Sequence, residues 1–200
     1  RSTLFPYTTL FRSERWESIV LDLKTEPGRA ALERLLATAD VFVQNLAPGA
    51  AARLGFSARQ LRERHPRLIA VDLSGYGDAG PYRDKRAYDL LVQSEGGLVS
   101  VTGTPEDPVK TGIPTADIAA GMYVFAGVLA GLLRRERGGT GAALDVTMFD
   151  SMVEWMGHQI QHSLHTGQQP RRMGLSHTVI APYNRYPSVQ IGRASCRERV

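Results

Sequence analysis

Asp117 offers the clearest chemistry in this sequence, because it stands near the start of a long apolar stretch, residues 112–137. The stretch has no proline after Pro114 and ends in a cluster of arginines, which predicts one helix with Asp117 at its positive end. A carboxylate in this position has two possible roles. It caps the helix by accepting backbone N–H bonds, or it is held ionised by the same amides as a nucleophile that attacks an activated carbonyl group and forms a covalent intermediate.

Asn45 and Arg53 form a second candidate group, in the loop NLAPGAAARLGF that follows the apolar run at residues 40–44. Ligands of parallel sheets bind at the carboxyl ends of the strands. An amide and a guanidinium at a strand end suit a nucleotide or a phosphate group. The same residue types also satisfy a turn and an exposed surface, so both interpretations stay open on these residues alone.

A G-x-G-x-x-G spacing, typical of dinucleotide sites, occurs at Gly75, Gly77 and Gly80. In such a site the glycines must open a helix, whereas Pro81 and a polar run follow here. The sequence therefore predicts a flexible loop in place of an NAD site. The basic residues that follow these glycines are either solvated or in contact with an anion.

His158, His162 and His165 lie near one another in a predicted helix, and the first two have the i,i+4 spacing of a metal-binding pair. The glutamate of an HExxH motif is missing, and histidine commonly serves as a partly buried polar residue. We therefore expect no metal site.

Both ends of the chain match a translated sequencing-library adapter. Residues 3–13, TLFPYTTLFRS, correspond to the oligonucleotide in one orientation, and residues 191–200, IGRASCRERV, to its reverse complement. We set residues 1–13 and 190–200 aside as non-native. Without them the net charge of +4 disappears, because five arginines and one glutamate are removed. The single cysteine, Cys196, goes with them, which excludes a disulfide, a CxxC metal site and a cysteine nucleophile.

The remaining segment, residues 14–189, alternates predicted strands with predicted helices. The predicted strands are residues 18–23, 40–44, 68–73 and 143–148. The predicted helices are residues 29–38, 57–64 (capped by Ser57 and ended by Pro66), 88–100 (interrupted by Gly96 and Gly97), 112–137 and 150–164. This alternation predicts an α/β, Rossmann-like parallel sheet with flanking helices.

Neutral charge removes the argument for a nucleic-acid partner. The apolar part of the long helix, residues 118–133, is shorter than a membrane span needs and rich in glycine and alanine, so we interpret it as core and expect no membrane partner.

Taken together, these pieces resemble the class III CoA-transferases, the family that includes formyl-CoA transferase, carnitine CoA-transferase and α-methylacyl-CoA racemase. Five segments carry the resemblance, in this order: SIVLDLK, VFVQNLAPGAAARLGF, HPRLIAVDLSGYGDAGPY, YDLLVQSEGGLVSVTG and TADIAAGMYVFAGVLAGLLRRERGGTGAALDVTMFD. The resemblance covers residues 14–189 and implies a partial large domain, because family members continue on both sides of it.

The resemblance also implies functional residues. In the motif matched by TADIAAG the aspartate is the nucleophile, which gives that role to Asp117. Binding of CoA is implied for residues of the NxxPGxxxRLGF motif and, more loosely for the lysine, for the segment just before the next helix. These residues are Asn45, Leu46, Arg53, Lys85, Arg86 and Tyr88.

The implied reaction transfers coenzyme A from an acyl-CoA donor to a carboxylic acid acceptor through an aspartyl anhydride and an aspartyl-CoA thioester. CoA and acyl-CoA are then substrates, and we expect no permanently bound cofactor and no metal. Family members assemble as interlocked dimers, so the full-length protein is expected to be a cytoplasmic homodimer and the segment alone to be inactive.

Two alternatives remain open. A 2-methylacyl-CoA racemase or isomerase of this family carries His-Asp where this chain has Tyr88-Asp89, so the racemase interpretation lacks one proton-transfer base and transfer is favoured. A non-catalytic, CoA-binding Rossmann-like domain would leave Asp117 as a helix cap.

Overall fold

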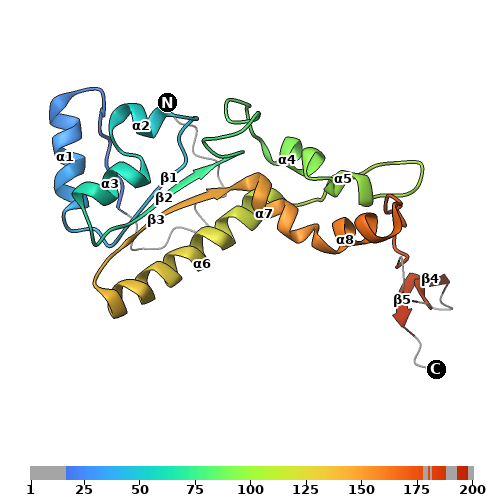
Figure 1. Cartoon of the computed structure of the whole chain (residues 1–200). Coiled ribbons are helices and arrows are strands. Elements are labelled where there is room, and N and C mark those ends of the chain that lie inside the picture. The colour runs from blue at the N-terminus through green and yellow to red at the C-terminus, as the bar shows by residue number, and fades with distance from the viewer. Residues whose placement is uncertain (1–16, 178–179, 181, 188–192, 198–200) are drawn as a thin grey trace. The chain divides into compact units, whose positions relative to one another are not determined.

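The computed structural model describes residues 17–177, 180, 182–187 and 193–197, and it divides into two units, Arg1–Thr38 and Ala39–Val200 (Figure 1). The first unit contains helix α1 (Glu26–Leu36). The second contains the sheet and the remaining helices.

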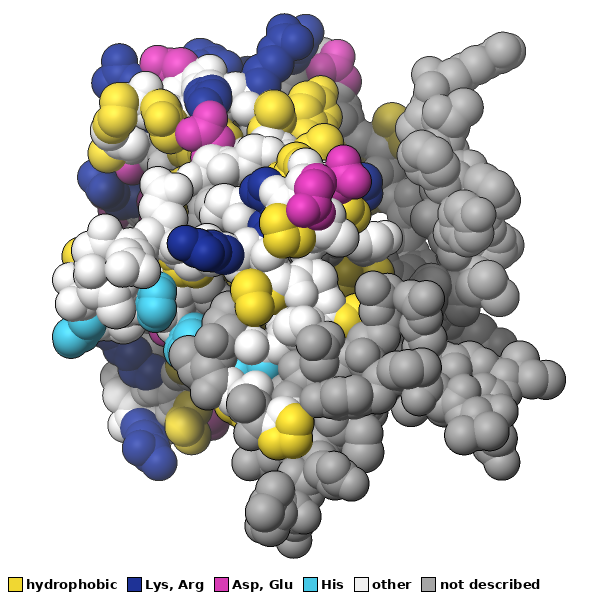
Figure 2. All heavy atoms as spheres, turned by 90° about the vertical axis from the view of Figure 1, so that its right-hand side faces the viewer, with side chains coloured by type: hydrophobic (Ala, Val, Ile, Leu, Met, Phe, Trp, Pro, Cys, Tyr) yellow, Lys and Arg dark blue, Asp and Glu magenta, His cyan; other side chains and the backbone are white. Residues whose placement is uncertain are grey.

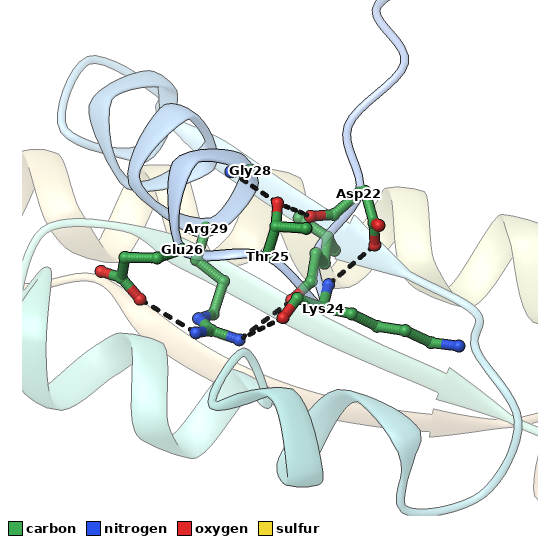
Figure 3. Close-up of polar contacts among 7 residues, drawn as sticks. Asp22, Lys24, Thr25, Glu26, Gly28 and Arg29 are labelled. Atoms are coloured by element: carbon green, nitrogen blue, oxygen red, sulfur yellow. Dashed lines mark hydrogen bonds and ion pairs between the residues drawn. The ribbon is translucent and has the colours of Figure 1, made fainter.

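Helix α1 begins at a cap made by Thr25, whose Oγ1 accepts a hydrogen bond from the Gly28 N–H at 3.2 Å. Figure 3 shows this cap and the carbonyl of Asp22, to which the Thr25 hydroxyl donates at 2.8 Å. Pro27 lies in the first turn, as predicted, because its missing N–H has no intrahelical partner to lose. Arg29 closes the turn by pairing with Glu26 at 2.9 Å.

The strand predicted at residues 18–23 is wrong. Residues 17–22 have no regular structure, and a turn begins at Leu23. The side chain of Val20 is 95% exposed. Because a strand needs a neighbour for its hydrogen bonds, this β-branched run stays irregular where the described residues offer it none.

The sheet of the second unit has three parallel strands in the order β1 (Val41–Gln44), β2 (Ile69–Ser74) and β3 (Ala142–Thr147). Val41 pairs with Ile69, and Ile69 pairs with Ala142, so these three residues fix the register of the three strands. Parallel pairing confirms the predicted α/β architecture. It also brings the loops after β1 and β2 to the same edge of the sheet.

Two short helices, α2 (Ala50–Leu54) and α3 (Ala58–Arg64), connect β1 to β2. As predicted, α3 is capped by Ser57, which forms a capping box with Gln60. The helix packs against β2 and β3.

Helix α6 (Thr115–Gly138) packs against β2 and β3 and lies on the side of the sheet away from α3 in Figure 1. Glycines allow the close approach: a Cβ at Gly131 would lie 3.1 Å from the Ile69 Cδ1, and one at Gly127 would lie 3.1 Å from the Leu144 Cδ1. At the far end of the helix, Arg135 pairs with Asp40 at 2.8 Å.

The prediction of a core helix is correct for one side of α6 only. One side of its first two turns buries small residues, whereas large apolar side chains are exposed along the other side of the helix. These are Ile118, Met122, Phe125, Leu129 and Leu133. By length and mean hydropathy (1.8), α6 meets the criterion for a membrane span in the part of the chain described, as core helices of soluble proteins also do.

Four further helices follow the sheet strands: α4 (Asp89–Glu95), α5 (Leu98–Val101), α7 (Met148–Trp155) and α8 (Gly157–Thr166). The interruption predicted at Gly96 and Gly97 separates α4 from α5. The single helix predicted at residues 150–164 is wrong, because the chain breaks at Met156, where Gly157 weakens helix propensity. A backbone hairpin of β4 (Tyr183–Pro187) and β5 (Arg193–Arg197) completes the described structure.

Helices α4, α6 and α7 share a small apolar core. It is made of Val92, Ala116, Ala120, Met148 and Met152, all buried. Ala116 immediately precedes Asp117, so this core supports the end of α6 that carries the candidate nucleophile.

Replacement of Gly141 by alanine is expected to destabilise the protein. A Cβ there would lie 2.1 Å from the Leu68 carbonyl oxygen, which is backbone and cannot turn aside. We expect Gly141→Ala to lower the free energy of unfolding by about 1–3 kcal/mol, measured by urea denaturation. The matched control is Gly138→Ala, where a Cβ meets nothing within 4 Å and alanine favours the helix. Equal stability of the two variants would contradict this packing.

Candidate active site

Asp117 lies in the first turn of α6, but it does not cap the helix. The N-cap position belongs to Pro114, and no side chain of the cap residue accepts a hydrogen bond there. The interpretation of Asp117 as the helix cap is therefore wrong for this structure. Its carboxylate is exposed at the surface and is not used to satisfy the helix end.

The cap of α6 comes instead from a neighbouring helix. Asp89, the first residue of α4, accepts a hydrogen bond from the Ala116 N–H at 2.9 Å through its Oδ1. Its other oxygen accepts from the Gln93 amide at 2.6 Å. Gln93 is fully buried, and its Oε1 accepts from the Thr111 N–H at 3.2 Å. Sequence reasoning missed this network, whose only local signal is the i,i+4 spacing of Asp89 and Gln93 on a helix.

Partial desolvation by surrounding protein atoms raises the pKa of the Asp117 carboxyl above its ordinary value, and the nearby negative charge of Asp89 raises it further. Both effects disfavour the charged form. Once ionised, Asp117 is therefore a stronger base and nucleophile than an ordinary aspartate.

Asn45 joins the ends of two strands. Its Nδ2 donates to the Leu73 carbonyl oxygen at 2.8 Å, from the end of β1 to β2. Arg53 is exposed on α2, and its Nη1 lies over Gly49, where a Cβ would be only 2.8 Å away. The two residues predicted as a group thus belong to one loop and the helix that follows it.

A pocket of about 540 Å³ opens at this edge of the sheet. It is lined by the loop after β1, by α2 and α3, and by β2 and β3. Of the predicted site residues, Leu46 lines this pocket, and its side chain is 47% exposed. Asp117 and residues 85–88 are outside its lining.

Three carboxylates line this pocket, Asp72 and Asp145 from the strands and Asp78 from the loop after β2, and sequence reasoning missed them. Asp72 accepts from the Gln44 amide at 2.9 Å and from the Ala58 N–H at 2.9–3.0 Å. Burial raises the pKa of Asp145, and the charges of Asp78 and Asp72 raise it further. Arg59 also lines the pocket, and its positive charge acts on the pKa of Asp145 in the opposite direction.

The predicted CoA-binding residues before α4 differ in their surroundings. Lys85 is ion-paired with Glu95, and its Nζ lies 4.3 Å from the centre of the Tyr82 ring. Its pKa is raised chiefly by the hydrogen bond to Glu95, and the pKa of Glu95 is lowered by the same bond. Arg86 and Tyr88 are exposed, Tyr88 by 68%.

The glycine-rich loop opens no helix, as predicted. Gly77 and Gly80 have positive φ (+85° and +83°), and Ser74 Oγ accepts from the Gly77 N–H at 2.9 Å. No group of three or more His, Cys, Asp or Glu side chains is placed to hold a metal ion within the described residues. Figure 2 shows the visible histidine side chains in one region of the face turned to the viewer.

Residues 8–191 match the family described as CoA-transferase family III. This chain belongs to that family. The resemblance drawn from the five sequence segments is therefore confirmed. Members use CoA thioesters as substrates.

Named relatives agree with the family assignment. An acetyl-CoA:oxalate CoA-transferase from Acetobacter aceti is 39% identical over 170 residues, 84% of this chain and 44% of that protein. A succinate–glutarate CoA-transferase from Agrobacterium fabrum (strain C58 / ATCC 33970) is 37% identical over 172 residues, 86% of this chain and 43% of that protein. The chain thus spans less than half the length of these relatives.

A solved structure shows the same fold. The crystal structure of a CAIB/BAIF family protein from Brucella suis superposes with a TM-score of 0.80 at 36% identity, covering 88% of this chain and 47% of that one. The α/β architecture is thereby confirmed.

Removal of the Asp72 carboxylate is expected to destabilise the pocket wall. Asp72→Ala leaves the Ala58 N–H at the start of α3 without its acceptor, so we expect the free energy of unfolding to fall by about 1–3 kcal/mol. Urea denaturation measures the change. Asp78→Ala is the matched control, because Asp78 is an exposed aspartate of the same pocket. A loss of stability in the control equal to that of Asp72→Ala would show that the hydrogen bonds are not its cause.

Proposed function

We propose that this chain is part of a CoA-transferase that moves coenzyme A from an acyl-CoA donor to a carboxylic acid acceptor, with Asp117 as the nucleophile. The observation that carries the proposal is the position of Asp117: an exposed carboxylate in the first turn of α6 that does not cap its own helix. Family membership supplies the reaction class, and the names of the relatives supply the two kinds of substrate.

The first half-reaction consumes the donor. The Asp117 carboxylate attacks the thioester carbonyl, the C–S bond breaks, and an acyl-aspartyl anhydride and the CoA thiolate result. The thiolate then attacks the aspartyl carbonyl carbon, which forms an aspartyl-CoA thioester and releases the donor acid as its carboxylate. The second half-reaction reverses these steps with the acceptor carboxylate and regenerates Asp117. No net proton, electron or water is consumed.

The environment of Asp117 supports this chemistry. The N-terminal end of a helix stabilises negative charge, and the tetrahedral intermediates on both carbonyl carbons carry negative charge on oxygen. The raised pKa of Asp117 makes its carboxylate more nucleophilic than that of an ordinary aspartate.

Six residues are proposed to bind CoA: Asn45, Leu46, Arg53, Lys85, Arg86 and Tyr88. The exposed guanidinium groups of Arg53 and Arg86 form no ion pair within the described part of the chain, so they are available to phosphates. The pocket beside Leu46 offers carboxylate acceptors at Asp72, Asp78 and Asp145 and one cation, Arg59, to a part of CoA that makes polar contacts. Lys85 takes part only when its ion pair with Glu95 opens.

No observation favours the racemase alternative, because Tyr88 stands where its base is needed and is largely exposed. We further propose that residues 14–189 are a segment of the large domain, that residues 1–13 and 190–200 are non-native, and that the full-length protein is a cytoplasmic homodimer without a bound cofactor.

Replacement of Asp117 by asparagine is expected to abolish covalent chemistry. The protein from the gene completed on both sides of residues 14–189 is incubated with a panel of acyl-CoA donors and hydroxylamine. Peptide mass spectrometry should find a donor-dependent mass change on the peptide that carries Asp117. Asp117→Asn should show none while its stability stays within about 0.5 kcal/mol of the original protein, because Asp117 is not the cap.

Asp150→Asn is the control for this experiment, since Asp150 lies in the first turn of the neighbouring helix α7. The Asp150→Asn protein should be labelled on the Asp117 peptide at the same rate as the original protein. CoA exchange by Asp117→Asn, or a CoA-binding protein that no donor labels, would refute the proposed function and favour the binding-domain alternative.

A further inference from the structure

The start of α6 has a hydrogen-bonding requirement that its own residues do not meet. The first amides of a helix lack intrahelical partners, and Pro114 at the N-cap position has no side-chain acceptor. Asp89 of α4 meets the requirement at the Ala116 N–H, 2.9 Å from its Oδ1. Because Ala116 precedes Asp117 directly, the cap that fixes the first turn also fixes the backbone of the nucleophile.

Asp89 is itself held in place. Gln93, one turn along α4 and fully buried, donates to its Oδ2 at 2.6 Å. The oxygen of the same amide accepts from the N–H of Thr111, in the loop that leads into α6, at 3.2 Å. The network therefore joins two turns of α4, the loop and the helix start, and a buried amide bonded at both ends is strongly constrained in its orientation.

We propose that Asp89, aligned by Gln93, is a positioning residue for Asp117, which it holds through the first turn of α6. The inference rests on the proposed role of Asp117 as nucleophile. Asp89 then sets the direction in which the Asp117 carboxylate meets the thioester carbonyl carbon. The rate of attack depends steeply on this direction.

Asp89 is also the charged neighbour of Asp117. Helices α4 and α7 and strands β2 and β3 pack against α6. Their charged residues are Asp72, Asp89, Glu95, Asp145, Asp150 and Glu154. Within the described residues, Asp89 is the one whose charge raises the pKa of the Asp117 carboxyl. The same residue thus holds the nucleophile and makes it more basic.

Three variants of the full-length protein separate these effects. Asp89→Asn keeps an oxygen for the Ala116 N–H but removes the charge and the acceptor of the Gln93 amide. Gln93→Leu removes both hydrogen bonds of the amide but keeps the charge. Asp89→Ala removes the cap and the charge. Asp150→Asn is the matched control, because it removes one charge from the first turn of α7.

The first measurement needs no substrate: the Asp117 carboxyl is titrated by carbon-13 NMR, with Asp117→Asn identifying its resonance. Asp89→Asn should lower the pKa of Asp117, whereas Asp150→Asn should leave it unchanged. The second measurement is the rate of acylation against pH. Since only the ionised carboxylate attacks, the acidic limb of this profile should move to lower pH in Asp89→Asn.

Acylation at the pH plateau tests positioning. We expect Asp89→Ala to lower its rate about 10- to 100-fold with little change in KM for acyl-CoA, and Asp89→Asn to restore most of the loss. Gln93→Leu should lower the rate without moving the acidic limb.

Unchanged titration, pH profile and plateau rate in Asp89→Asn and Gln93→Leu, in a protein that acylates Asp117, would overturn the positioning role alone. Failure of the proposed function looks different: the original protein is not acylated, yet the pKa of Asp117 still falls in Asp89→Asn, which supports the pairing of the two carboxylates. If Asp89→Ala does not fold, the other two variants decide the question.

Discussion

The parallel pairing of β2 with a strand on each side is the constraint on which the second unit depends. Val41, Ile69 and Ala142 stand in register, so the strand ends, and the loops that follow them, meet at one edge of the sheet. Parallel strands require crossover connections, and α6 is the longest helix of the connection between β2 and β3, which also contains α4 and α5. The pocket beside Leu46 and the loop at Asn45 owe their position to this pairing.

Much of this architecture could be predicted because its signals are local. Short apolar runs bounded by turn residues gave β1, β2 and β3 to within one residue or two, and Ser57 with Gln60 is a capping box visible in the sequence. The place of Asp117 near the start of a helix followed from Pro114 and the apolar run. Its assignment as nucleophile came from the family motif and stays a prediction.

What could not be predicted involves partners far apart in the chain. The cap of α6 joins residues 27 positions apart, and the Lys85–Glu95 pair joins a loop to a helix. Residues 18–23 have the composition of a strand, but composition does not supply a neighbouring strand. The break at Met156 separates two segments that both have helical sequence patterns. Because the apolar periodicity continues through Met156, the sequence does not reveal the break.

The exposed side of α6 affects how this chain behaves in solution. Phe125 is 66% exposed, and three further apolar side chains of the same helix are at least half exposed: Met122, Leu129 and Leu133. A contiguous apolar surface of this kind binds hydrophobic dyes and lowers colloidal solubility. A sample of this chain alone would therefore give the dye-binding signal usually ascribed to a molten globule, even though its sheet and helices are fully formed.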